Sequence, residues 1–264
     1  DVEIIHVDSL RERNMVLSAT AFRLTPVVVI QHGLRVADAS QEEFLKAWKV
    51  SLLTASFQNL TTIAHAEHFS FLPMPWGADL EMFKLPPVTT RRFDKVVIVG
   101  AMTEDESHGQ VLFAAAHAGL RVAHIGASWN PLCGRCPFGV LSVYEDPPLL
   151  CKPISDLGGR APCAWHDNLG KLSDAAMVRE LQTAKYVAVL RKFEGFELLG
   201  IEALFCGARP IVYDIPTYDW YRSSAVTISS GLSSSDLFLR LTDLMRTPPV
   251  PVTDSELVDL HERF

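Results

Sequence analysis

The sequence predicts an α/β protein built on parallel β-sheets, and three observations lead to this fold class. Continuous runs of β-branched and other apolar residues occupy positions 27–30, 96–99 and 187–190, as in strands that are buried on both faces of a sheet. Segments with helical patterning separate these runs, which favours repeated βαβ units. Glycines close several of the predicted strands and helices, as the turns of such units require.

The composition is that of an ordinary globular protein. The 264 residues are 48% hydrophobic and 21% charged, with a formal net charge of −7 that offers no general attraction to nucleic acid. The length allows one large domain or two of modest size. We see neither an apolar run long enough to span a membrane nor a basic-then-apolar leader, and we therefore expect a cytoplasmic protein.

The first part of the chain is expected to form a small α/β unit. Residues 2–7 are predicted to form a strand and residues 9–21 a helix. Further strands are predicted at 27–30 and 52–56. His32 follows the 27–30 strand, at the strand end where α/β sheets place their ligands, although a single histidine is more often structural or simply exposed.

The second part of the chain repeats this alternation of strands and helices. The predicted elements lie at 96–100, 110–118, 121–126, 174–183 and 232–245. Gly119 closes the first of these helices, and Ser234 or Ser235 is expected to cap the last.

A strand, a glycine turn, a helix and a second strand follow one another at 187–213. Gly207 stands where a helix C′ glycine is expected, and Pro210 prevents the helix from continuing. A helix that starts at such a turn presents unpaired backbone N–H groups to an anion outside the strand ends. Glu194 at the turn can meet a ligand directly, whereas Glu202 reaches one only if the helix flanks the site and is otherwise solvated.

This unit also carries a family resemblance, in Glu194-Gly195-Phe196, Glu202-Ala203 and residues 207–212. Their sequence and spacing resemble the E-x7-E signature of retaining glycosyltransferases of the GT-B fold. Residues 72–83 are similar to the "PNGVD…F" segment that follows the last strand of the N-terminal domain in this family. The resemblance is loose over residues 1–126 and good over residues 165–216.

The resemblance implies a GT-B architecture of two Rossmann-like domains that face a cleft. An N-terminal acceptor-side domain, incomplete at its start, is expected at 1–84, followed by a linker at 85–95. The nucleotide-sugar-binding domain is expected at 96–250, and the C-terminal segment 251–264 would cross back toward the first domain.

The resemblance also implies an activity. Enzymes of this family move a hexose from a nucleotide-diphosphate sugar to an acceptor hydroxyl with retention of the anomeric configuration, usually without a catalytic metal. By position, Glu194 would lie against the donor sugar, Glu202 would hold the ribose, and His32 would approach the sugar from the other domain. The groups that would face the diphosphate are the backbone of Gly195, Phe196, Glu197 and Leu198. The nucleotide (UDP, GDP or ADP) stays open, as does the acceptor: a glycan, a glycolipid, a small molecule or, without support from the charge balance, a nucleic acid.

Two positions depart from the family pattern. Where relatives carry Gly-Arg and Lys-Gly to neutralise the diphosphate, this chain has Gly100-Ala101 and His108-Gly109. Either Arg191 and Lys192 compensate from the neighbouring loop, or the donor differs, or the chain is inactive. We favour compensation, with salt bridges at the surface as an equal alternative for these two side chains. The alternatives to a transferase are a catalytically inactive nucleotide-sugar-binding or scaffold protein, and a sugar-nucleotide epimerase or phosphorylase of the same fold.

Four cysteines allow a structural metal site. Cys133 and Cys136 form a C-x2-C pair, and Cys151 and Cys163 follow. Four thiolates can hold a zinc ion, with His166 as an alternative fourth ligand, but the second half of the set lacks the C-x2-C that would make the pattern specific. Unpaired buried thiols or a disulfide are the other interpretations.

An aromatic cluster follows the strand at 211–213, and it comprises Thr217, Tyr218, Asp219, Trp220 and Tyr221. In relatives a glycine pair commonly stands there. The cluster either covers the acceptor or the nucleotide base, or it closes the core, and we expect the core role for each residue taken singly.

Overall fold

The computed structural model describes residues 28–31, 52–55, 70–73, 77–86, 95–100, 107–126, 166–192 and 197–264. The chain divides into two compact units, residues 1–74 and 75–264. The sequence placed the end of the first domain at residue 84. In the structure, residues 77–86 belong to the second unit. Phe83 is buried in the core of that unit, and the Lys84 carbonyl accepts a hydrogen bond from Gln182 (2.8 Å).

The first unit contains a parallel sheet with the strand order β1-β2-β3. Its strands are β1 (Val28–Gln31), β2 (Leu52–Ala55) and β3 (Ser70–Pro73). The apolar runs had predicted β1 and β2, and both are confirmed. β3 was not predicted as a strand, because its closing proline made the segment resemble an extended turn. The predicted strand at 2–7, the helix at 9–21 and His32 lie outside the described residues.

The second unit is built on a parallel sheet with the order β6-β5-β4-β7-β8-β9. Its strands are β4 (Lys95–Val99), β5 (Arg121–Ile125), β6 (His166–Gly170), β7 (Tyr186–Val189), β8 (Arg209–Tyr213) and β9 (Val226–Ile228). Numbered within the unit, this is the Rossmann order 3-2-1-4-5-6. The order reverses between β4 and β7, so a ligand crevice is expected outside the carboxyl ends of these two strands. The predicted α/β fold class is therefore confirmed.

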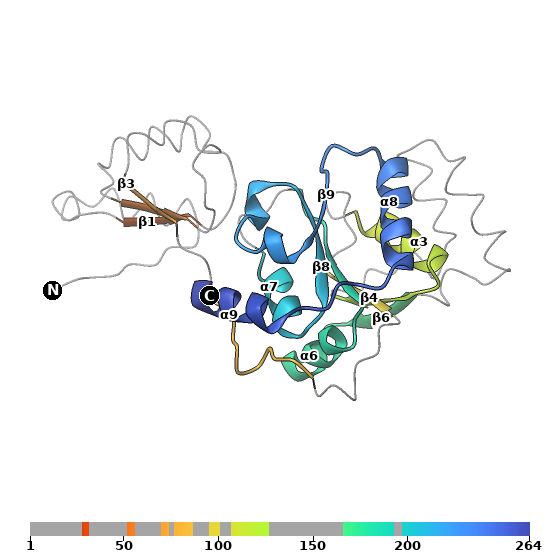
Figure 1. Ribbon diagram of the computed structural model, residues 1–264, viewed down its shortest axis with the longest axis horizontal. Coiled ribbons are helices and arrows are strands. Elements are labelled where there is room, and N and C mark those ends of the chain that lie inside the picture. The colour runs from red at the N-terminus through yellow and green to blue at the C-terminus, as the bar shows by residue number, and fades with distance from the viewer. Residues whose placement is uncertain are drawn as a thin grey trace. The chain divides into compact units, whose positions relative to one another are not determined.

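Helices cover both faces of this sheet. They are α3 (His108–His117), α6 (Asp174–Gln182), α7 (Leu198–Phe205), α8 (Ser234–Arg246) and α9 (Asp254–Arg263). α3 and α8 pack side by side, and α7 lies across the sheet from them, in contact with α6 (Figure 1). Within the described part of the chain, none of the helices has both the length and the hydrophobicity needed to cross a membrane.

Several elements differ from those that the sequence predicted. α3 begins at His108 rather than at Gln110. The cap of α8 is Ser233, whose side chain accepts a hydrogen bond from the backbone of Asp236 (3.1 Å), rather than Ser234 or Ser235. The residues before α6, expected to lead directly into that helix, form the edge strand β6.

The core of the second unit lies between the sheet and its helices. β4 and β7 are buried along most of their length, as the continuous apolar runs predicted. The aromatic cluster belongs to this core: Tyr218, at the end of the 3₁₀ helix η7 (Pro216–Tyr218), and Tyr221 are both fully buried. Of the two predicted roles of the cluster, these tyrosines therefore take the core role.

Candidate functional site

The carboxyl ends of β4 and β5 form one side of the expected crevice. Gly100 follows β4, and its carbonyl lies 2.7 Å from His124 Nε2. A Cβ atom on Gly126, where φ is 155°, would stand only 2.5 Å from the same carbonyl. The backbone after β4 is thus held closely against β5, and the predicted donor-binding role of Gly100 stays a prediction.

His108, the residue that replaces the lysine of the family pattern, is the first residue of α3 and is only 3% exposed. Its ring centroid lies 5.9 Å from that of the buried His124. Ser107, just before it, adopts a left-handed backbone conformation and its hydroxyl lies 2.7 Å from that of Tyr213. Burial limits what the His108 ring can offer to a ligand outside the strand ends, and its predicted donor-binding role is untested.

Arg191 and Lys192, the two predicted compensating cations, have different surroundings. Arg191 Nη1 lies 3.3 Å from a carboxylate oxygen of Glu197, and both side chains are largely buried. Lys192 is exposed, and its Nζ lies 5.8 Å from the ring centroid of Tyr213. A cation over an aromatic face at this distance is weakly attracted to it, so Lys192 is held at the carboxyl edge while its charge stays in contact with solvent.

Glu197 is the N-cap of α7. Its carboxylate accepts a hydrogen bond from the backbone N–H of Leu199 (3.2 Å), and the residue is only 9% exposed. The side chain therefore serves the helix and the ion pair with Arg191. A role for the backbone of Glu197 and Leu198 toward a diphosphate stays a prediction.

Glu202, on α7, is partly buried. Burial raises the pKa of its carboxyl to about 7, and the nearby carboxylates of Glu197 and Asp174 act in the same direction. Partial burial favours the other interpretation of Glu202, in which its helix flanks a site. A ligand that donates hydroxyl hydrogen bonds to this carboxylate would stabilise its ionised form. Carboxyl groups with such raised pKa values are frequent at functional sites.

Several predicted site residues lie outside the described residues. They are His32, Glu194, Gly195, Phe196, Cys133, Cys136, Cys151 and Cys163. For His166 the backbone is described, in β6, but the side chain is not. Where the chain is described, no group of three or more His, Cys, Asp or Glu side chains could hold a metal ion.

The sequence did not single out the packing of Tyr221 against α7. A Cβ atom on Gly200 would overlap the Tyr221 hydroxyl and stand 2.5 Å from two of its ring carbons. We expect Gly200→Ala to lower the free energy of unfolding by about 1–3 kcal/mol, although alanine favours helices by about 1 kcal/mol. Urea denaturation measures this loss. Gly231→Ala is the matched control, because a Cβ there meets nothing closer than 3.8 Å, and an equal loss in both variants would contradict the steric argument.

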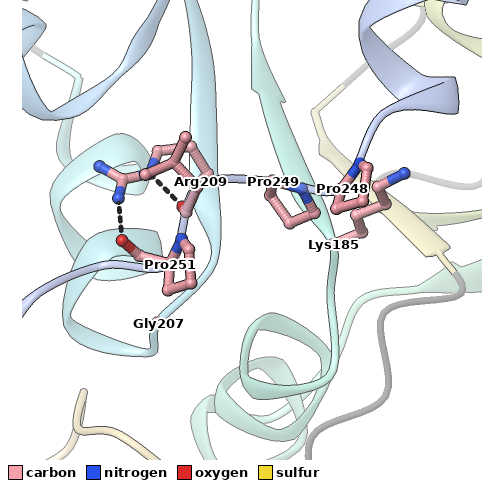
Figure 2. A pocket seen from close by; sticks show the side chains of 7 residues that line it. Lys185, Gly207, Arg209, Pro248, Pro249 and Pro251 are labelled. Atoms are coloured by element: carbon pink, nitrogen blue, oxygen red, sulfur yellow. Dashed lines mark hydrogen bonds between the residues drawn. The ribbon is translucent and has the colours of Figure 1, made fainter.

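A cavity of about 320 Å³ opens at the other end of the sheet (Figure 2). Its lining residues are Lys185, Gly207, Arg209, Pro248, Pro249, Val250 and Pro251. The guanidinium of Arg209 donates to the carbonyls of Val250 (3.0 Å) and Pro251 (2.6 Å). Lys185 donates to the carbonyl of Met245. Arg209 thus holds the segment between α8 and α9, whereas Lys185 holds the last turn of α8. The cavity lies at the amino ends of β7 and β8, away from the expected crevice.

Comparison with known proteins gives matches among solved structures. No protein-family model and no curated protein sequence matches the chain. A GtfA/B complex matches with 12% identity over 92% of this chain and 50% of that chain, at a TM-score of 0.61. The pneumococcal O-GlcNAc transferase GtfA, solved with UDP and GlcNAc, matches with 12% identity over 85% of this chain and 46% of that chain, at a TM-score of 0.56. An α,α-trehalose-phosphate synthase (UDP-forming) from Burkholderia vietnamiensis matches with 11% identity over 90% of this chain and 64% of that chain, at a TM-score of 0.54.

The chain spans about half the length of the first two of these structures. At such identities the likeness concerns the fold, and it agrees with the Rossmann strand order of the second unit and with the parallel sheet of the first. The chain is an α/β protein with the GT-B fold, which it shares with these structures.

Proposed function

We propose that the protein is a glycosyltransferase that binds a nucleotide-diphosphate sugar at the carboxyl edge of the second sheet and transfers its hexose, with retention, to an acceptor hydroxyl. The observation that carries the proposal is Glu202, a partly buried carboxyl with its pKa raised to about 7 on a helix that starts at the strand-order reversal. The fold supports the proposal, as do neighbours whose names include UDP.

The nucleotide would be held by Glu202 and Lys192. A ribose offers hydroxyl donors to the Glu202 carboxylate, and hydrogen bonds to an ionised acceptor are among the strong ones. The diphosphate would meet Lys192, which is exposed at this edge, and the first backbone N–H groups of α7. We assign this charge role to Lys192 rather than Arg191, because Arg191 pairs with Glu197.

The sugar would be held by Glu194 and His32, on the strength of the sequence resemblance. In transfer, the bond between the anomeric carbon and the diphosphate breaks as the acceptor oxygen bonds to that carbon, and negative charge grows on the leaving oxygens. The proton of the acceptor hydroxyl passes to the leaving diphosphate. Lys192 and the amides that begin α7 would stabilise that charge, and fixed donors aimed at developing charge usually contribute more to catalysis than any other single effect. The same groups bind the diphosphate product.

A second candidate is a protein that binds nucleotide sugars without transferring them. It is favoured by Ala101 and by the burial of His108, which is only 3% exposed where relatives place a lysine. Incubation with the sugar derivatives of the bound nucleotide separates the two, because only the transferase releases free nucleotide diphosphate.

Calorimetric titration with UDP, GDP and ADP tests the proposal. We expect saturable binding of one nucleotide to the wild type, weakened tenfold or more (about 1.4 kcal/mol) in Glu202→Ala. Glu262→Ala is the matched control, since Glu262 is exposed on α9. If a folded wild-type chain binds none of the three nucleotides, the proposal is wrong.

A further inference from the structure

A tyrosine hydroxyl holds the chain just after β7. Tyr218 accepts a hydrogen bond from the backbone N–H of Arg191 (3.1 Å) and donates one to the carbonyl of the same residue (2.9 Å). The ring is fully buried in the core. One side chain thus forms hydrogen bonds with both backbone groups of Arg191. This residue comes after Val189, the last residue of β7 that pairs with a neighbouring strand.

A second tyrosine contacts the other end of the segment that joins β7 to α7. Tyr221, also fully buried, donates a hydrogen bond to the carbonyl of Glu197 (3.4 Å) and its ring packs against Gly200. The two ends are joined directly as well, by the ion pair between Arg191 and Glu197. The start and the end of the segment 191–197 are therefore both attached to the chain that follows β8.

These attachments fix the groups that the proposed function needs. Lys192 follows Arg191 directly, and the first amides of α7 follow Glu197. Phenylalanine would fill the same core volume as either tyrosine. The hydroxyls add what phenylalanine lacks, which is hydrogen bonds to the backbone groups of Arg191 and Glu197.

We propose that Tyr218 and Tyr221 are positioning residues for nucleotide binding, whose hydroxyls hold Lys192 and the start of α7 where a diphosphate binds. This inference rests on the proposed function. Neither tyrosine touches the ligand, so substitution acts through the residues that they hold, and the contacts to the nucleoside are unchanged.

The test compares the affinities of the full chain for UDP and UMP by calorimetry; if the wild type prefers GDP or ADP, that nucleotide and its monophosphate are used. We expect Tyr218→Phe to weaken UDP binding about threefold to tenfold, the worth of one or two hydrogen bonds, and to weaken the binding of UMP, which has one phosphate instead of two, by a smaller factor. Tyr186→Phe is the matched control, because this buried tyrosine donates to the carbonyl of Leu244 (3.3 Å) at the amino end of the sheet. It should change neither affinity.

Combining Tyr218→Phe with Lys192→Met identifies the route of the effect. If Tyr218 acts through Lys192, the loss of UDP affinity caused by Tyr218→Phe should be at least threefold smaller in the Lys192→Met background than in the wild type. Thermal unfolding verifies that each variant is folded, and Tyr221→Phe repeats the test should Tyr218→Phe unfold. If both tyrosine variants are folded and keep the ratio of UDP to UMP affinity of the wild type, the inference is wrong but the proposed function stands. If the wild type binds no nucleotide, the proposed function itself is wrong.

Discussion

Replacing Arg209 with alanine is expected to lower the free energy of unfolding of the second unit by about 3–5 kcal/mol, as when one partner of a buried ion pair is removed. Arg209 is only 5% exposed and pairs through both terminal nitrogens with Glu256, at 2.7 and 3.2 Å. It also donates to the carbonyls of Ser224, Val250 and Pro251. The substitution would leave these acceptors without their donor and release α9 from β8. Urea denaturation at pH 7 measures the loss.

Acid should remove the same contribution in the wild type. Although burial opposes ionisation, hydrogen bonds from Arg209 and Thr253 lower the pKa of Glu256 from 4.5 to about 2. A lowered carboxyl pKa contributes stability that is present above about pH 4.5 and is lost as the pH falls through about 2. We expect the Arg209→Ala variant to lose less stability than the wild type over this range.

An exposed arginine provides the control for this prediction. Arg263, on α9, pairs with Asp259 at 2.6 Å, and its side chain is 38% exposed. Arg263→Ala should cost no more than about 1 kcal/mol, because exposed ion pairs contribute little. Equal losses in the two variants would mean that the Arg209 contacts do not hold the unit together.

The central strands of the second unit could be predicted from sequence for a physical reason. A strand segment covered on both faces must be apolar, and residues 96–98 of β4 and all of β7 are such runs. The end of α7 was equally predictable, because Gly207 has a φ of 81°, a left-handed conformation that other residues adopt only with strain. In both cases the local sequence carries the whole signal.

Structure that depends on distant partners could not be predicted. β6 has the polar sequence His-Asp-Asn-Leu-Gly, and it is a strand because it pairs with the edge of β5. The contact between Arg209 and Glu256 joins positions 47 residues apart. Neither residue has a local pattern that would single it out.

In the candidate site, too, the sequence identified residues but not their contacts. The sequence offered Arg191 and Lys192 as equal candidates for the diphosphate, since both precede Glu194. Their surroundings separate them, because one pairs with Glu197 and the other stays exposed over Tyr213. Tyr218 and Tyr221, which hold Arg191 and Glu197, were noticed as part of an aromatic cluster, but no sequence pattern shows which backbone groups their hydroxyls reach.

Replacing Glu202 with glutamine is expected to raise the free energy of unfolding by about 2–3 kcal/mol at pH 8, while weakening the binding of the nucleotide. Burial, together with the carboxylates of Glu197 and Asp174, raises the pKa of Glu202 from 4.5 to about 7. For a raised pKa, stability is fully present below about pH 4.5 and is lost as the pH rises through about 7. Glutamine has no charge to bury, so the gain of the variant over the wild type should be near zero at pH 4 and complete at pH 8.

Urea denaturation of both proteins at pH 4, 6 and 8 measures this gain, with Glu262→Gln on the exposed face of α9 as the control. A gain that does not depend on pH, or one that Glu262→Gln shares, would mean that the Glu202 carboxylate is well solvated after all. A gain confined to high pH, together with weaker nucleotide binding, has a different meaning. It would show that the fold tolerates a destabilising charge on α7 because the ionised carboxylate is needed by the ligand, as is common where stability and function compete at one residue.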